Sequence, residues 1–435
     1  FAIPSIIAMM VSAIYNIVDQ FFIGHAVGYL GNAATNIAFP LAMMCTSIGL
    51  LFGIGGASSF NISMGAEEKE AAPYYIGNSI VMLLASGTLL FLLVELFLTP
   101  MLIAFGSPEN VLPYAKEYVS ITAIGFPFLI ITTGGGHLIR ADGSPKMTMI
   151  CNLSGAIINV FLDALFVIGF GWGMGGAAWA TVIGQVFSGI LALSYLSNCK
   201  TVRIKKKHLI PNPHYLKRIT SLGAASGINQ IAMMAVQIVL NNSLKYYGAR
   251  SELGEAIPIA SAGIVTKVNQ MFFSVIIGIA QGSQPIESFN YGAKKYDRVR
   301  KTYFLAISVG AILSILSFST FQLLPRQIIS LFGEGSEIYY KFGTNYFRIF
   351  LFFTIVNFMQ PITSTFFTSI GKAYKGIFLS LTRQILFLLP FMIVLPLFMG
   401  IDGILYSGLI ADLLAFIVTV IMISIELRNI SKLER

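Results

Sequence analysis

The sequence predicts an all-α integral membrane protein in which twelve transmembrane helices form two parallel six-helix repeats. Three observations lead to this fold class: an apolar composition, a succession of long apolar segments and an internal repeat. Of the 435 residues, 56% are hydrophobic and only 11% are charged, whereas an average soluble protein has about 25% charged residues. So few charged side chains cannot cover a globule in water, and lipid is therefore the expected solvent of most of the chain.

Apolar segments long enough to cross a bilayer follow one another along the whole chain. A hydrocarbon core of about 30 Å needs about 20 apolar residues in a helix, and a single span satisfies its backbone within lipid only as a helix. The run already under way at Phe1 suggests that a short polar segment precedes it. The expected spans are 1–26, 33–64, 72–98, 112–139, 147–169, 176–198, 217–247, 257–290, 301–324, 337–369, 374–399 and 403–427.

Basic residues predict the orientation of these spans. The net charge is +9, which in a soluble protein would suggest nucleic acid as a partner. Here, most Lys and Arg residues fall on one side of the membrane when the loops are assigned alternately, and that side is the cytoplasm. Both termini and the basic segment 200–216 are therefore expected in the cytoplasm, and nucleic acid is not an expected partner.

The basic segment 200–216 separates two related halves. We expect an N-lobe, 1–199, with the first six helices, and a C-lobe, 217–435, with the last six. Met64–Glu70 aligns with Tyr291–Asp297 between the halves. An even number of helices gives both copies the same orientation, and a repeat of this kind is typical of transporters that alternate access by rocking one half against the other.

Acidic residues inside two predicted spans mark a candidate ion site, because a charge within a span is costly and is usually functional. Asp19 in the first span, Asp163 in the fifth and Thr181 in the sixth lie at one depth if each residue adds 1.5 Å of rise. One helical turn before each of them stand, respectively, Tyr15, Asn159 and the carbonyl of Ala177. Such oxygen atoms suit a proton or a small hard cation such as Na⁺. The alternative is a set of separate helix-packing hydrogen bonds, which Asn or Ser would supply at lower cost.

The C-terminal half does not repeat this arrangement, since Phe391 stands where the repeat would place an acid matching Asp163. It carries other ionisable residues within its spans. Lys267 and Asp412 either pair near the midplane or line a polar cavity, and Lys267 could instead snorkel or only fix the bundle. The residues of this possible C-lobe cavity are Lys267, Arg383 and Asp412.

Several motifs recur in order along essentially the whole chain: Pro4 with Tyr15 and Asp19, Arg140–Lys146, Asn159 with Asp163, Gly175–Thr181, Gln281–Pro285, Asn290–Lys294 and Arg383–Gln384. Together they resemble the multidrug and toxic compound extrusion (MATE) family, in its DinF-like and MepA-like bacterial branch. This resemblance implies two six-helix lobes in a V around a central cavity. It also implies a coupling site of Asp19, Asn159, Asp163, Thr181 and the Ala177 carbonyl.

Two features depart from the family pattern. The seventh span contains no acid, unlike that of the NorM-like branch, which argues against an ion site in the C-lobe. Glu287 stands where an apolar residue or glycine is expected.

The favoured function is therefore secondary antiport in a bacterial plasma (inner) membrane, exporting lipophilic organic cations or metabolites in exchange for H⁺ or Na⁺. If the ion is Na⁺, its side-chain ligands are Asp19, Asn159, Asp163 and Thr181, with Pro4 and Tyr15 supporting the N-lobe site. We expect no cofactor beyond this ion, a monomer surrounded by membrane lipid, and a small-molecule substrate.

Two alternatives to antiport are a flippase and an enzyme. A lipid-linked oligosaccharide flippase of the same superfamily would need several cations around a pyrophosphate, and Lys267 and Arg383 supply at most two. An enzyme is not expected, because the sequence contains neither a metalloprotease HExxH motif nor a GxSxG nucleophile elbow.

Overall fold

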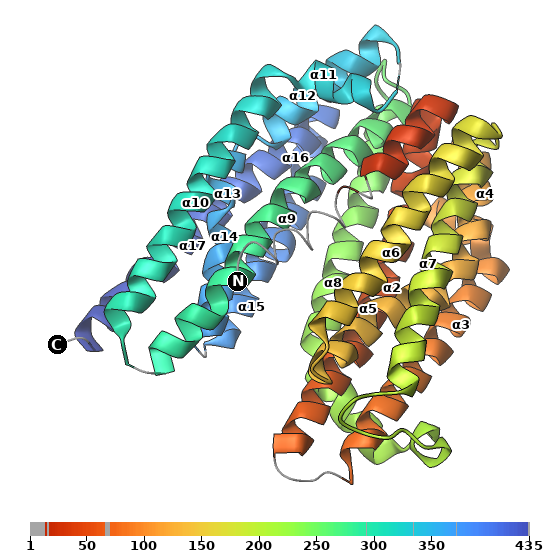
Figure 1. Ribbon diagram of the computed structural model, residues 1–435. Coiled ribbons are helices and arrows are strands. Elements are labelled where there is room, and N and C mark those ends of the chain that lie inside the picture. Colours follow the sequence, from red (N-terminus) through yellow and green to blue (C-terminus); the bar gives the residue numbers. More distant parts are fainter. Residues whose placement is uncertain are drawn as a thin grey trace. The chain divides into compact units, whose positions relative to one another are not determined.

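The computed structural model describes residues 14, 17–65, 70–292, 294–333, 335–370 and 372–433, and the described residues are overwhelmingly helical (Figure 1). Each of the twelve predicted spans has a helical counterpart. Nine described helices are long and apolar enough to cross a membrane, two bent pairs each provide a further span, and Ile17–Val27 is the described part of the first. The predicted all-α membrane fold is confirmed, with nine to eleven candidate spans among the described residues.

Several predicted spans consist of more than one element. The fourth joins α4 to α5 through a 3₁₀ turn, η1, that precedes Pro127, a residue that cannot donate a helical hydrogen bond. The fifth and eleventh each contain a π-helix, and the tenth bends by 41° between Glu337–Phe350 and Thr354–Phe367. The elements are α2 Tyr29–Gly65, α3 Ala72–Ala104, α4 Leu112–Thr122, η1 Ala123–Gly125, α5 Phe126–Ala141, α6 Pro145–Asp163, η2 Ala164–Gly169, α7 Gly173–Ser197, η3 Lys206–Leu209, α8 Pro213–Gly248, α9 Ala256–Gly292, α10 Tyr296–Leu323, α11 Pro325–Leu331, α12 Glu337–Phe350, α13 Thr354–Asn357, α14 Met359–Ser369, α15 Ala373–Leu381, η4 Thr382–Leu388, α16 Leu389–Met399 and α17 Ile401–Leu433.

The chain divides into two compact units. The first, which we call the N-unit, is Phe22–Ile238, and the second, the C-unit, contains the described residues of Phe1–Phe21 and of Val239–Arg435. These units differ in extent from the predicted lobes. The first part of α8 belongs with the N-terminal helices, whereas the first span up to Phe21 belongs with the C-terminal ones. The basic segment 200–216 therefore does not mark the boundary between the two compact units, which falls later, between Ile238 and Val239.

Close backbone contact explains why α8 joins the N-unit. A Cβ atom added to Gly55 of α2 would lie 1.9 Å from the Ile219 carbonyl oxygen, and one added to Gly223 of α8 would lie 1.8 Å from that of Leu51. Ser47 Oγ also donates a hydrogen bond of 2.9 Å to the Gly227 carbonyl. Small residues and such hydrogen bonds are the usual means of association between membrane helices. In the C-unit, α9 packs against α10, α12 and α14, and α17 packs against α12, α16 and η4.

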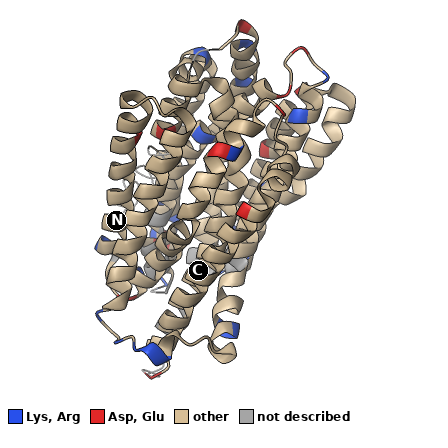
Figure 2. Ribbon diagram, turned by 90° about the vertical axis from the view of Figure 1, so that its right-hand side faces the viewer, with Lys and Arg blue, Asp and Glu red and all other residues tan. Residues whose placement is uncertain are grey.

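Charged residues are sparse along the described helices, as the coloured ribbon of Figure 2 shows. The described spans therefore present apolar surface over most of their length, and many large aliphatic and aromatic side chains are exposed on them. Such a surface suits a hydrocarbon environment.

Candidate functional site

Asn159, Asp163 and Thr181 form a buried polar cluster in the N-unit. Asn159 and Asp163 stand one turn apart at the end of α6, and Thr181 is on α7, which packs against α6 (Figure 1). Their side chains are 1%, 0% and 6% exposed, respectively. With the Asn159 amide assigned so that its nitrogen faces the carboxylate, the orientation that matches its donor and its acceptor, Nδ2 donates to Asp163 Oδ2 at 3.0 Å, while Oδ1 accepts from Thr181 Oγ1 at 3.3 Å and from the Thr181 backbone N–H at 3.1 Å. The Asn159 amide therefore connects the buried carboxyl group to α7.

Two glycines bring α6 and α7 close enough for these contacts. A Cβ atom added to Gly155 would lie 2.0 Å from Ser188 Oγ, and one added to Gly184 would lie 2.7 Å from the Gly155 carbonyl oxygen. Gly155 stands one turn before Asn159, and Gly184 lies beside the Asn159 Cβ atom. Glycine at both positions therefore sets the interhelix distance at which Asn159 reaches Thr181.

The helix changes its hydrogen-bonding register directly after Asp163. The segment Ala164–Gly169 is a π-helix, η2, and the N–H of Phe170 bonds to the Leu165 carbonyl five residues earlier. The chain then turns through Gly171 and Gly173, both with positive φ, and α7 begins at Gly173. Such π-helical turns are frequent at functional sites. The glycines that follow η2 were the only signal of it in the sequence.

The backbone of Ala177 contributes to the same cluster. In an α-helix the Thr181 N–H points at the Ala177 carbonyl, and here that N–H is also 3.1 Å from Asn159 Oδ1. The Thr181 N–H thus faces both the Ala177 carbonyl of its own helix and the Asn159 side chain of α6. Four of the five residues predicted to bind the coupling ion are therefore brought together in the N-unit.

Asp19, the fifth predicted residue, belongs to the C-unit. Asp19 and Lys267 of α9 are both buried, 6% and 9% exposed, and their opposite charges interact. Asp19 therefore has a counter-charge within its own unit. Its participation in the Asp163 cluster stays a prediction, and Pro4 and Tyr15 lie outside the described residues.

Arg383 and Asp412 form a buried ion pair in the C-unit. Arg383 Nε donates to Asp412 Oδ1. Asp412 therefore pairs with Arg383, whereas a pair with Lys267 was one of the alternatives that the sequence left open. Depth along the helices suggested it, but depth does not tell which helices are neighbours: α17 contacts η4, the π-helix that carries Arg383. The charges of Lys267, Arg383 and Asp412 all have partners within the C-unit.

Two further buried carboxyl groups lie in the C-unit, on α17 and α9. Glu426 of α17 is 1% exposed and accepts from Lys372 and Lys375, the latter at 2.8 Å. Glu287, the departure from the family pattern, is fully buried in α9 and interacts electrostatically with Tyr303 of α10. Their positions near the ends of predicted spans gave no sign of burial.

Asp142 ties the loop after α5 to the start of the segment that follows α7. Its carboxylate accepts from Tyr195 Oη at 2.7 Å, from the Lys200 N–H at 2.7 Å and from the Thr201 N–H at 3.0 Å. Burial acts to raise the pKa of Asp142, but the hydrogen bonds from Thr201, Tyr195 and Lys200 outweigh it and hold the pKa below its ordinary value of 3.8. Asp142 is thus ionised at neutral pH and fixes the beginning of this segment.

We expect the segment around η3 to loosen when His208 is protonated. Lys205 N–H donates to His208 Nδ1 at 3.0 Å, a bond that requires Nδ1 to be unprotonated. Burial lowers the pKa of His208 from 6.5, and the charges of Lys207 and Lys205 lower it further. The imidazole therefore stabilises the folded segment above pH 6.5 and ceases to do so as pH falls below 6.5.

Amide hydrogen exchange of residues 200–212, corrected for intrinsic rates, checks this prediction. Protection is expected to fall between pH 7.5 and pH 5.5 in the parent. His208→Asn should remove the pH dependence, since Asp142 titrates only at lower pH. Equal pH dependence in the two proteins would contradict the assignment to His208.

Comparison with known proteins shows the family. The MatE family model matches residues 4–165 and 225–394, so both halves of the chain carry the same kind of segment. The multidrug export protein MepA of Staphylococcus haemolyticus (strain JCSC1435) is 24% identical over 430 residues, covering 98% of this chain and 93% of that protein. MepA of Staphylococcus aureus (strain MSSA476) is 23% identical over 424 residues, covering 97% and 92%.

Solved structures show the same fold. An inward-facing multidrug resistance MATE family transporter of the MOP superfamily has a TM-score of 0.86 at 21% identity, covering 96% of this chain and 95% of that chain. The MATE multidrug transporter DinF-BH, solved in complex with the dye rhodamine 6G, has a TM-score of 0.78 at 31% identity, covering 99% and 95%. With its spans, its two units and these matches, the chain belongs to the MatE family of multidrug efflux transporters.

Proposed function

We propose that this protein is a secondary antiporter that exports lipophilic organic cations in exchange for H⁺ or Na⁺, and that Asp163 binds the coupling ion. The observation that carries the proposal is the buried Asn159–Asp163–Thr181 cluster within the N-unit. A buried carboxyl group in a membrane span is expensive, and ion and proton pathways are where such groups are retained.

The Asn159 amide gives this cluster two states. When Asp163 is ionised it only accepts hydrogen bonds, so the amide nitrogen faces it and the amide oxygen faces Thr181. A proton or a Na⁺ ion on Asp163 requires an oxygen opposite it. The amide oxygen then turns toward Asp163 and gives up the hydrogen bonds that it accepts from Thr181 Oγ1 at 3.3 Å and from the Thr181 backbone N–H at 3.1 Å. Ion binding at α6 thereby removes hydrogen bonds made with α7, which is a means of coupling the ion to helix movement.

Asp19 and Lys267 provide a second charge-sensitive element. Their interaction in the C-unit means that neutralising Asp19 leaves the Lys267 ammonium buried without its counter-charge, at a cost that favours rearrangement. We place Asp19 in the coupling mechanism on this ground, with its membership of the Asp163 site kept as a proposal.

Lipophilic cations fit the composition of the spans. The chain has 35 Phe, 18 Tyr and 17 Met residues, side chains that adapt to flat apolar molecules and, for the aromatic ones, attract cations. The similar transporter DinF-BH is solved with rhodamine 6G, which makes this dye, called rhodamine below, the first probe for this protein. The pairing of Lys267 and Arg383 with acids argues against the flippase alternative, whose pyrophosphate needs available cations.

We further propose that the protein works as a monomer in the bacterial plasma membrane with both termini in the cytoplasm. The excess of basic residues on the side of segment 200–216 supports this orientation.

Transport in proteoliposomes tests the proposed function. Rhodamine efflux is expected to accelerate when a pH or a Na⁺ gradient is imposed inward, and the gradient that acts identifies the ion. Liposomes without protein control for leakage of the dye. Movement of an anionic metabolite under either gradient, with no movement of rhodamine or of tetraphenylphosphonium, would contradict the assigned substrate class.

A further inference from the structure

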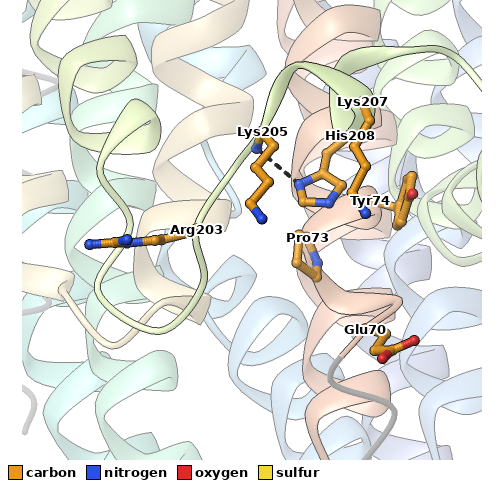
Figure 3. Close-up of a pocket in the computed structure, with 7 residues that line it drawn as sticks. All are labelled: Glu70, Pro73, Tyr74, Arg203, Lys205, Lys207 and His208. Carbon is orange, nitrogen blue, oxygen red and sulfur yellow. Dashed lines mark hydrogen bonds between the residues drawn. The ribbon is translucent and has the colours of Figure 1, made fainter.

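A basic pocket lies where the segment between the two halves crosses the beginning of α3 in the N-unit. Its volume is about 460 Å³, within the usual range for small-molecule sites. Figure 3 shows Lys205 and Lys207 extending from the segment toward Pro73 and Tyr74 of α3, with Arg203 to one side and Glu70 at the lower end. Its lining is Glu70, Pro73, Tyr74, Arg203, Lys205, Lys207 and His208.

The cations stand on a backbone that is fixed to α3. Asn78 Nδ2 donates to the His208 carbonyl at 3.1 Å and to the Ile210 carbonyl at 3.3 Å, and Asn78 Oδ1 accepts from the Asn212 N–H at 2.8 Å. A Cβ atom added to Gly77 would lie 2.3 Å from the His208 carbonyl oxygen, so α3 and the segment are in backbone contact there. The arrangement is therefore pre-formed, and little ordering cost remains when a ligand binds.

Aromatic contacts hold the wall of the pocket in place. The His208 ring meets the Tyr74 ring edge-on at 4.6 Å between centroids, and Tyr74 stacks on Tyr215 at 4.9 Å. His208 is 5% exposed, so it closes the pocket from inside while the lysines on either side of it remain exposed. The cationic groups are thus the part available to a ligand.

The charge of the lining selects an anion. Among the described residues that line the pocket, Arg203, Lys205 and Lys207 are cationic and Glu70 is acidic, so its formal charge is positive with His208 neutral. Arg and Lys together are the usual ligands of phosphate oxygens, Arg as a two-pronged donor and Lys as a point charge. Pro73 and Tyr74 are in the first turn of α3, whose apolar span begins at Ala72, so the pocket is level with the membrane surface.

We propose that this pocket binds a phosphate group, and that an anionic phospholipid headgroup is its source at the membrane surface. Basic pockets at the cytoplasmic side of membrane helices are suited to such headgroups. A bound phosphate neutralises the repulsion among the three cations and holds the segment between the two halves against α3. This site is separate from the Asp163 cluster, and its occupancy does not depend on the coupling ion.

Hydrogen exchange of residues 200–212 in neutral detergent tests the proposal. Dihexanoyl phosphatidylglycerol is titrated into the full-length protein, with dihexanoyl phosphatidylcholine and inorganic phosphate in separate arms. Phosphatidylglycerol is expected to slow exchange of this segment and phosphatidylcholine is not. If inorganic phosphate also slows exchange, phosphate itself is the ligand. If only phosphatidylglycerol slows it, the ligand is the lipid headgroup.

Variants with matched loss of charge locate the effect. Arg203→Gln/Lys205→Gln/Lys207→Gln is expected to weaken the apparent affinity for phosphatidylglycerol at least about tenfold, because each cation near an anionic lipid contributes about 1 kcal/mol. Lys294→Gln/Lys295→Gln/Arg298→Gln removes the same charges from the α9–α10 loop and the first turn of α10, and should leave the affinity unchanged. Equal affinity in the two triple variants, or no effect on the parent, would overturn the proposal. If the first variant loses protection without ligand, Lys205→Gln replaces it, with an expected loss of about fivefold.

Discussion

Asp163→Asn is expected to reduce ion-driven export to the level of liposomes without protein, while the variant remains folded and inserted. The amide side chain has almost the same size as the carboxyl group, so packing between α6 and α7 is retained, but it cannot be ionised. The Asn159 amide then has no change of charge to respond to. Normal elution in size-exclusion chromatography together with absent gradient-driven rhodamine efflux is the expected result.

Thr181→Val provides the graded control for that experiment. It keeps the ionisable group and removes one hydroxyl partner of the Asn159 amide at 3.3 Å. Thr181 is also a proposed ligand of the ion, and loss of that oxygen, at about 1 kcal/mol for one neutral hydrogen bond, should raise the ion concentration for half-maximal efflux about fivefold with the maximal rate little changed. Efflux by Asp163→Asn at the parent rate would remove this cluster from the coupling mechanism.

Breaking the Arg383–Asp412 pair is expected to destabilise the protein strongly. Arg383→Met leaves the Asp412 carboxylate buried at 1% exposure without its counter-charge, a change that costs about 3 to 5 kcal/mol. Asp412→Leu does the same to Arg383. The double variant Arg383→Met/Asp412→Leu removes both charges and should recover most of the lost stability, because an apolar pair of similar volume replaces a buried ion pair at little cost.

Thermal unfolding in detergent measures this cycle, and rhodamine efflux of the double variant gives its functional meaning. We expect the double variant to export rhodamine under the gradient, because the coupling cluster is in the other unit. A stable double variant without export would show that the pair belongs to the substrate cavity. If the double variant instead loses as much stability as the two single variants together, the two residues do not form a pair.

The spans and the N-unit cluster followed from the sequence because both depend on local regularities. Apolar length defines a span, and a spacing of four residues places Asn159 and Asp163 on one face of α6. Gly28, with a φ of +81°, is enough to separate Ile17–Val27 from α2, so the second helix begins four residues before the predicted span.

The sequence does not show which helices pack side by side within each unit. Lys267 and Asp412 lie at similar depths, yet Asp412 pairs with Arg383 of η4, and Lys267 interacts electrostatically with Asp19 of the first span. Asp142 and Glu426 likewise have partners more than 50 residues away, at 58 and 54 residues for Lys200 and Lys372. Pairings over such separations depend on helix packing, which a periodic pattern in one segment does not encode.

Ion movement driven by the substrate is the most direct test of exchange at Asp163. When rhodamine is loaded on one side of proteoliposomes without any ion gradient, an antiporter must move H⁺ or Na⁺ in the opposite direction, because the coupling between two transported species is reciprocal. We predict that an internal pH dye or ²²Na⁺ uptake reports this movement in the parent and in Thr181→Val, and reports none in Asp163→Asn. Rhodamine flux without any counter-movement of either ion in the parent, or unchanged counter-movement in Asp163→Asn, would contradict the account.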